Sequence, residues 1–278
     1  VFPDPSAYPA RMAGRLTICA TPIGNLDDLT PRVRAALGAC DLVACEDTRR
    51  TGQLLHLLGI DVRMTSIEAH REDAAIPDLV RRLQAGEHVC LATDAGMPLV
   101  SDPGGATVRA AIAAGIDVEV LPGADAVTTA LVASGLPSDR FAFIGFLPRA
   151  AGAIAKTLDE ADRWGVTLVA FESPNRLPST LALLAERAPA RRVAVCRELT
   201  KLHEEIARGT AAELAAHFAS APKGEIALVL EPLATEGAAP AAIEAALVEL
   251  RERGLGAKDA ARLVAGLTGL SARDLYRP

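Results

Sequence analysis

The sequence predicts two α/β domains followed by a short helical tail. Short apolar runs alternate with helical segments, and short connections join them, which indicates a mainly parallel sheet covered by helices on both faces. A turn-rich stretch at residues 135–140 separates two such alternating halves. With 278 residues, 50% of them hydrophobic, the chain is long enough for two domains with their own cores.

The first half shows the clearest alternation. Thr30 precedes a proline, so a helix is expected with Thr30 as its cap and Pro31 at its first position. The expected strands are residues 16–20, 42–44, 64–66, 88–92 and 117–121. The expected helices are residues 30–39, 50–58, 74–85, 105–114 and 127–134.

The second half is again α/β, without a detectable repeat of the first. Its expected strands are residues 141–145, 166–171, 192–196 and 225–230, and its expected helices are residues 153–161, 177–186 and 210–219. A linker rich in Pro, Ala and Gly at residues 231–240 precedes three expected helices at 241–253, 257–267 and 271–276. The predicted domains are a loose leader at 1–15, an N-terminal α/β domain at 16–136, a C-terminal α/β domain at 137–232 and a helical tail at 241–278.

The composition argues against several functional classes. A net charge of −6 disfavours a protein that coats nucleic acid by bulk electrostatics, although a local basic groove stays possible. Aromatic residues make up only 3%, which disfavours a wide base-stacking platform. The five cysteines show no metal-ligand spacing, so free thiols and no metal site are expected. No apolar run approaches a membrane span and residues 1–15 lack a signal peptide's apolar centre, so we expect a soluble, cytoplasmic protein without membrane contact.

Carboxylates and turn residues follow several expected strands of the first half. Asp94 and Asp102 come after the strand at 88–92, in a segment whose Gly/Pro corners let a ligand approach the backbone. Asp125 follows the strand at 117–121, in a turn that opens the next expected helix. A surface loop with ordinary turn residues is the alternative. Repetition of the pattern at several strand ends favours a ligand-binding cleft.

Charged residues also follow strands in both halves. Glu46 and Arg49 follow the strand at 42–44, where they either bind a polar substrate or begin a helix capped by Asp47 or Thr48. In the second half, the segments FESPNR at 171–176 and CRELTK at 196–201 supply two carboxylates and three cations. Arginines suit recognition of phosphate or carboxylate groups. Mutual ion pairing at a boundary between domains is the alternative.

Seven segments, taken in order, resemble one family. They are TPIGNL at 21–26, CEDTR at 45–49, DAGMPLVSDPG at 94–104, FIGFLP at 143–148, FESPNR at 171–176, RELTK at 197–201 and KGE at 223–225. Together they resemble the branch of the tetrapyrrole methylase family that methylates the 2′-hydroxyl of a cytidine in 16S ribosomal RNA of the small subunit. The resemblance covers about residues 16–230, and the helical tail also resembles this family's C-terminal segment.

The resemblance implies two α/β domains with S-adenosylmethionine in the cleft between them, a homodimer, and 16S ribosomal RNA or the small ribosomal subunit as substrate. Carried over by position, the cofactor-binding residues are Pro22, Gly24, Asp94, Ala95, Gly96, Met97, Val100, Asp125 and Ala126. The sequence departs from the family's usual residues at Thr93, Met97, Asp125, Asn175 and residues 67–70. Asn175 argues against a catalytic histidine at that position.

Methyl transfer to a ribose hydroxyl is an in-line displacement without a metal, in which the hydroxyl loses its proton. We expect Glu172, Glu198 and Lys201 to be catalytic residues, with a carboxylate as the proton acceptor. The expected substrate-binding residues are Glu46, Arg49, Arg176 and Arg197. The tail either orients RNA or is a plain helical extension. The cations that could touch RNA phosphates are Arg251, Arg253, Lys258, Arg262, Arg273 and Arg277, but nearby carboxylates nearly cancel their charge. Two other functions remain open: a tetrapyrrole (precorrin-type) methylase, and a non-catalytic nucleic-acid-binding regulator that reads through its tail.

Overall fold

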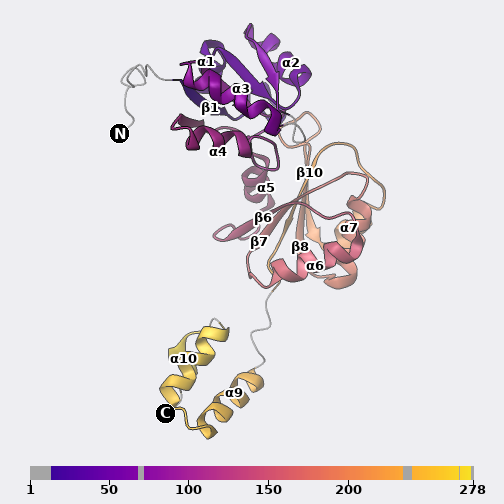
Figure 1. Cartoon of the computed structure of the whole chain (residues 1–278). Coiled ribbons are helices and arrows are strands. Elements are labelled where there is room, and N and C mark those ends of the chain that lie inside the picture. The colour runs from indigo at the N-terminus through magenta and orange to yellow at the C-terminus, as the bar shows by residue number, and fades with distance from the viewer. Residues whose placement is uncertain (1–13, 68–71, 234–239, 269, 277–278) are drawn as a thin grey trace. The chain divides into compact units, whose positions relative to one another are not determined.

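The computed structural model describes residues 14–67, 72–233, 240–268 and 270–276 (Figure 1). The predicted leader therefore lies almost entirely outside the described residues, as do residues 68–70 and Arg277. The chain forms two compact units, one comprising Val1–Thr157 with Thr167–Glu231 and the other comprising Leu158–Val166 with Pro232–Pro278. The first unit contains two five-stranded sheets.

The first sheet is entirely parallel, in the order β3-β2-β4-β1-β5. Its strands are β1 (Arg15–Cys19), β2 (Leu42–Cys45), β3 (Met64–Ser66), β4 (His88–Ala92) and β5 (Asp117–Leu121). The helices that follow the first four strands are α1 (Pro31–Ala39), α2 (Thr48–Leu58), α3 (Glu72–Gln84) and α4 (Gly105–Ala113). All five expected strands and all five expected helices are confirmed, the fifth helix at Ala126–Ser134, with ends that differ by at most two residues.

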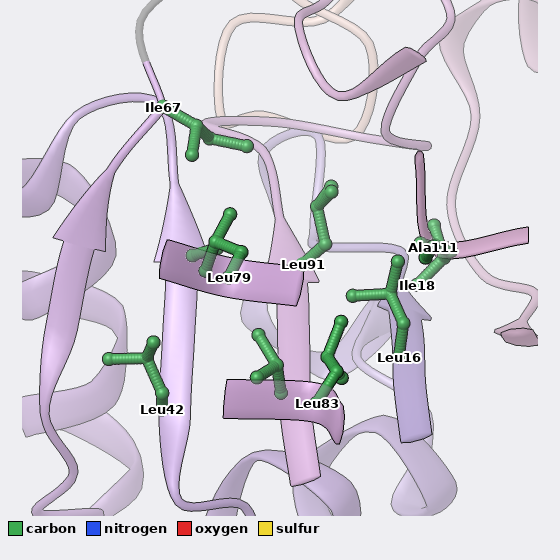
Figure 2. Close-up of a cluster of buried hydrophobic side chains, with 10 residues drawn as sticks. Leu16, Ile18, Leu42, Ile67, Leu79, Leu83, Leu91 and Ala111 are labelled. Atoms are coloured by element: carbon green, nitrogen blue, oxygen red, sulfur yellow. The ribbon is translucent and has the colours of Figure 1, made fainter. Parts of the chain in front are cut away.

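Alternate residues of each strand enter different cores, because successive side chains of a strand point to opposite faces of the sheet. Leu16 and Leu91 pack with α3 and α4, as Figure 2 shows for Leu79 and Leu83 lying against the strands. The other core includes Val33 of α1 and residues of α2. Helices therefore cover both faces, and only the strand ends are left for ligands.

Local capping explains where the helices begin. The Thr30 hydroxyl accepts a hydrogen bond from Val33 N–H, which confirms Thr30 as the cap of α1. Asp47 caps α2 by accepting from Arg49 N–H. Asp125 caps α5 (Ala126–Ser134) by accepting from the N–H groups of Val127 and Thr128. Asp47 and Asp125 lie within four residues of the ends of β2 and β5, so these two caps place carboxylates at the carboxyl edge of the first sheet.

The second sheet is mixed, in the order β6-β7-β10-β8-β9, with β6 and β7 parallel and the other pairs antiparallel. Its strands are β6 (Phe141–Phe146), β7 (Thr167–Glu172), β8 (Arg192–Arg197), β9 (Glu205–Thr210) and β10 (Ile226–Leu230). Its helices are α6 (Ala151–Asp162), α7 (Leu177–Arg187) and α8 (Ala211–His217). The sequence analysis missed β9, an edge strand whose polar sequence EIARGT lacks an apolar run. Helix α5 packs on this sheet through Val127, Ala130 and Leu131.

The tail folds as three helices, α9 (Pro240–Glu252), α10 (Ala257–Thr268) and α11 (Ala272–Leu275), as expected. Ile243, Ala260 and Val264 form its buried side. Among the described residues, no helix is long and apolar enough to cross a membrane. The two-sheet α/β architecture with a helical tail confirms the predicted fold class.

Candidate active site

The loops that follow β1 and β4 are joined by hydrogen bonds. Thr21 N–H donates to the Gly96 carbonyl (2.9 Å), and Gly96 N–H donates to the Thr21 carbonyl (3.0 Å). The Thr21 hydroxyl donates to the Thr93 carbonyl at 3.1 Å. Gly96 has a φ of +83°, a left-handed conformation that glycine adopts without strain. The two loops therefore form one connected surface at the carboxyl edge of the first sheet.

The loop between β4 and α4 also holds two non-glycine residues in left-handed conformations. Leu99 has a φ of 74° and Ser101 a φ of 69°. Such conformations cost about 1–3 kcal/mol each, and they concentrate where a chain serves a function. The segment that the sequence singled out is thus one of the more strained parts of the described chain.

A cavity of about 500 Å³ opens against this surface, which lies within the usual size range of small-molecule sites. Its other wall comes from the second sheet, including Phe171 and Glu172 at the end of β7 and Glu225 just before β10. Nine of the predicted site residues line the cavity: Glu46, Asp94, Ala95, Gly96, Met97, Val100, Asp125, Ala126 and Glu172. Seven do not: Pro22, Gly24, Arg49, Arg176, Arg197, Glu198 and Lys201.

Besides the helix cap Asp125, three carboxylates face the cavity from the first sheet. Burial raises the pKa of Glu46, and the neighbouring charges of Asp102 and Asp94 raise it further. Burial also raises the pKa of Asp102, although the Thr93 hydroxyl donates to Asp102 Oδ2 at 2.7 Å. Asp94 accepts from Asp47 N–H and lies 3.5 Å from the Arg50 guanidinium. We call Glu46, Asp94 and Asp102 the acidic wall. Its negative charge exceeds the positive charge of the neighbouring Arg50.

Glu172 is the buried carboxylate of the opposite wall. Ser173 N–H donates to Glu172 Oε1 at 2.6 Å, and the Thr180 hydroxyl donates to Glu172 Oε2 at 2.6 Å. The Arg176 guanidinium lies 2.5 Å from Oε1 and also donates to the carbonyls of Leu147 and Pro148. Arg176 thus connects the end of β7 to the loop that follows β6.

Lys201 lies between two carboxylates. Its ammonium group donates to Glu198 Oε1 at 2.8 Å and to Glu225 Oε2 at 2.7 Å. Burial lowers the pKa of Lys201, but the two carboxylates outweigh it, so that the pKa is raised overall. The same ammonium group lowers the pKa of Glu198, and Glu225 N–H lowers it further.

The loop after β1 lies directly against this group. A Cβ at Gly24 would lie 2.4 Å from Lys201 Cγ, and Asn25 N–H donates to the Thr200 hydroxyl at 3.0 Å. Only a glycine leaves room for the Lys201 side chain here. Gly24 therefore allows the first-strand loop to contact the segment that carries Lys201.

The remaining predicted cations have carboxylate partners outside the cavity. Arg197 donates to Glu205 Oε2 at 2.9 Å, and His217 lies 3.1 Å from Oε1 of the same carboxylate. Arg49 pairs with Asp47, whose pKa it lowers to about 2. Among the described residues, no group of three or more His, Cys, Asp or Glu side chains is placed to hold a metal ion.

Comparisons with known proteins place this geometry in a family. Residues 15–215 match the family described as Tetrapyrrole (Corrin/Porphyrin) Methylases, which is more than half of the chain. The chain belongs to the tetrapyrrole methylase family. Residues 237–277 match a second family, described as the RsmI C-terminal HTH domain.

Relatives of similar length share much of the sequence. The Ribosomal RNA small subunit methyltransferase I of Mesorhizobium japonicum is 44% identical over 97% of this chain and 92% of that protein. The protein of the same name from Mycobacterium tuberculosis is 43% identical over 95% of this chain and 94% of that protein. The family resemblance predicted from seven short segments is therefore confirmed.

Solved structures share the fold at low sequence identity. A diphthine synthase has a TM-score of 0.63 at 16% identity, covering 78% of this chain and 89% of that one. Uroporphyrin-III C-methyl transferase from Thermus thermophilus, solved in complex with S-adenyl homocysteine, has a TM-score of 0.55 at 20% identity. That likeness covers 78% of this chain and 97% of the Thermus protein.

The sequence analysis gave no site role to several residues that line the cavity. These lining residues are Ile23, Arg50, Ser101, Phe146, Phe171, Ser173, Pro174, Gly224, Glu225 and Ile226. Phe146 and Glu225 stand within quoted family segments, so position in a motif was an available signal. Arg50 adjoins the predicted Arg49, and consecutive helix residues point about 100° apart.

Proposed function

We propose that this chain is an S-adenosylmethionine-dependent methyltransferase that modifies the 2′-hydroxyl of a cytidine in 16S ribosomal RNA of the small subunit. Relatives of over 40% identity that span nearly the whole chain bear the name of a small-subunit ribosomal RNA methyltransferase. The observation that carries the proposal is the acidic wall, which suits a cationic methyl donor. The substrate would place the reaction in the cytoplasm.

The residues present fit S-adenosylmethionine. Its sulfonium and amino groups are positive, and the acidic wall supplies three carboxylates for them. Ala95, Gly96 and Ala126 bring backbone groups to the cavity with little side chain in the way. Met97 and Val100 add apolar surface for the adenosine. Pro22 and Gly24 would support the site from the neighbouring loop.

Bound S-adenosylmethionine supplies the electrophilic methyl group, and the chain must orient the ribose oxygen in line with it. The 2′-hydroxyl proton must move to an acceptor. Of the two carboxylates predicted as bases, Glu172 lines the cavity and Glu198 does not. We therefore assign proton acceptance to Glu172. Glu198 and Lys201 would position Glu225 and the loop at Gly24.

The helical tail would add RNA affinity. Lys258, Arg262 and Arg273 line one surface hollow of α10 and α11 together with Tyr276, and none of the carboxylate side chains that the structure describes lines it. Clustered cations suit RNA phosphates. Replacing the three cations with glutamate is expected to weaken RNA binding and to leave S-adenosylmethionine affinity unchanged. Unchanged RNA affinity would contradict a role for this hollow.

Radiolabelled methyl transfer tests the function directly. Small ribosomal subunits from cells lacking this protein are expected to accept label on a cytidine ribose, and tetrapyrroles are not. Label on tetrapyrroles alone would favour the second family activity, and no label on any acceptor would support a non-catalytic regulator. Equilibrium sedimentation of the same preparation tests the proposed homodimer.

A further inference from the structure

Three phenylalanines form a row on one face of the second sheet. The rings of Phe143 and Phe171 have centroids 4.9 Å apart with an interplanar angle of 63°. The rings of Phe171 and Phe146 have centroids 5.4 Å apart with an angle of 62°. Edge-to-face pairs of this kind stabilise one another beyond simple burial. The row holds half of the six phenylalanines in the chain.

A β-bulge brings the third ring into the row. Phe143 pairs with Val169, and regular pairing would place Gly145 opposite Phe171. Instead Phe146 pairs with Phe171, so β6 has one extra residue there. Gly145 has a φ of 69°, which a residue with a Cβ rarely adopts. Bulges often redirect a side chain beside a functional site, and this one turns Phe146 onto the face of Phe143 and Phe171.

The row runs from the core into the cavity. Phe143 and Phe171 pack against the core that includes α5. Phe171 and Phe146 both line the cavity, yet Phe146 leaves 61% of its surface exposed. An exposed phenylalanine forgoes the stabilisation that burial of its ring would give. A ring kept open to solvent but braced by a half-buried neighbour provides a flat, preorganised surface.

We propose that Phe146, braced by Phe171, is the stacking platform for the base of the acceptor nucleotide. The inference rests on the proposed function and adds a base-binding subsite to it. Proteins that act on one RNA nucleotide commonly unstack its base and stack it on an aromatic ring. A Cβ at Gly145 would lie 3.8 Å from the Ser101 hydroxyl oxygen. The platform thus adjoins the β4–α4 loop that would hold the methyl donor, and Glu172 lines the same cavity.

The test compares the Phe146→Ala variant with Phe146→Trp and a matched control. Phe141 lies in the same strand, is 42% exposed and does not line the cavity, so Phe141→Ala is the control. Methyl transfer to small ribosomal subunits is measured as kcat and KM, and S-adenosylmethionine binding is measured by calorimetry. Stacking on an aromatic ring contributes about 1–3 kcal/mol per base, which corresponds to about a 5- to 150-fold change.

We expect Phe146→Ala to lower kcat/KM for the subunit by that factor, mainly through KM, with unchanged S-adenosylmethionine affinity. Phe146→Trp is expected to restore most of the loss, because a larger ring still stacks. Equal kinetics in Phe146→Ala and Phe141→Ala would overturn the proposal. So would a changed oligomeric state in Phe146→Ala, which would make Phe146 an interface residue. A wild-type protein that labels no RNA would instead refute the proposed function.

Discussion

The carboxylates on the two walls of the cavity differ in how far neighbouring cations neutralise them. On the first-sheet wall, Glu46 and Asp102 have raised pKa values because they are partly buried near one another and near Asp94. On the second-sheet side, Glu172 is held by an arginine and two further donors. Lys201 there lies between two carboxylates. One wall has excess negative charge, and on the other side each of the carboxylates Glu172, Glu198 and Glu225 has a cationic partner.

This difference indicates that the first wall binds the charged ligand and that the ion pairs of the second wall hold the loops of the site in place. Excess charge of one sign in a partly buried site attracts a ligand of the opposite sign. Ion pairs that satisfy one another hold loops in place and have little left for a ligand. The first wall is therefore expected to respond to mutation mainly through methyl-donor affinity. The second wall is expected to respond through stability, through acceptor placement and, at Glu172, through the proposed proton transfer.

The largest expected effect is on the second wall. Glu172→Ala removes a carboxylate whose side chain is fully buried, and it leaves Arg176 without its carboxylate partner and the Thr180 hydroxyl without its acceptor. Breaking a buried pair in this way costs about 3–5 kcal/mol. Urea denaturation should show this loss in the free energy of unfolding. Glu186→Ala, at an exposed position of α7, is the control and should change it by less than about 0.5 kcal/mol. Equal stability of both variants would show that the network is not structural.

The next effect concerns the first wall. Asp94→Asn keeps the shape of the side chain and removes its charge, so S-adenosylmethionine should bind about 10- to 100-fold more weakly. S-adenosylhomocysteine lacks the sulfonium charge and should lose less affinity. Asp47→Asn is the matched control, because Asp47 does not line the cavity. Equal losses for both ligands in calorimetry would mean that Asp94 does not act on the sulfonium charge.

Acidification from pH 7.5 should weaken methyl-donor binding by a smaller factor than Asp94→Asn does. The pKa values of Glu46 and Asp102 are raised, so these carboxyls gain protons at a higher pH than usual. Protonation removes negative charge from the wall, and affinity for a cation therefore falls as the pH falls. The double variant Glu46→Gln, Asp102→Asn should bind weakly at both pH values. A pH dependence that persists in this variant would assign the effect to other groups.

The smallest effect distinguishes two adjacent arginines. Arg50 lines the cavity beside Asp94, whereas Arg49 is 88% exposed and pairs with Asp47. Arg50→Ala is expected to change methyl-transfer kcat/KM about 3-fold or more. Arg49→Ala should change it by less than about 2-fold, since exposed pairs contribute little. A larger effect of Arg49→Ala would restore the substrate-binding role that the sequence analysis gave to Arg49.

The sequence predicted the strand ends better than the side-chain partners. Strands β3, β4 and β5 have the predicted bounds, because apolar runs flanked by turn residues leave little choice. β9 was missed because an edge strand needs no apolar run. Arg176 and Arg197 were assigned to the substrate, but backbone carbonyls and Glu205 bind them. Spacing along the chain does not show which of several possible partners a long side chain binds in the folded protein.

The aromatic row shows a second limit of sequence reasoning. The low aromatic content argued against a wide stacking platform. That argument depends on the number of rings in the chain and does not consider where they lie. The bulge at Gly145 changes the register by one residue and brings Phe146 beside Phe171. Alternation along β6 would have placed Phe146 on the opposite face from Phe143. The direction of the Phe146 side chain depends on how β6 pairs with β7, and the residue pattern within β6 does not determine that pairing.

Calorimetric titration of the purified chain with S-adenosylmethionine tests the central claim most directly, because every proposed role depends on a methyl donor at the acidic wall. The account predicts one binding site per chain, with affinity that falls in Asp94→Asn and is kept in Asp47→Asn. Absence of binding to the wild-type chain, or equal binding in both variants, would contradict it.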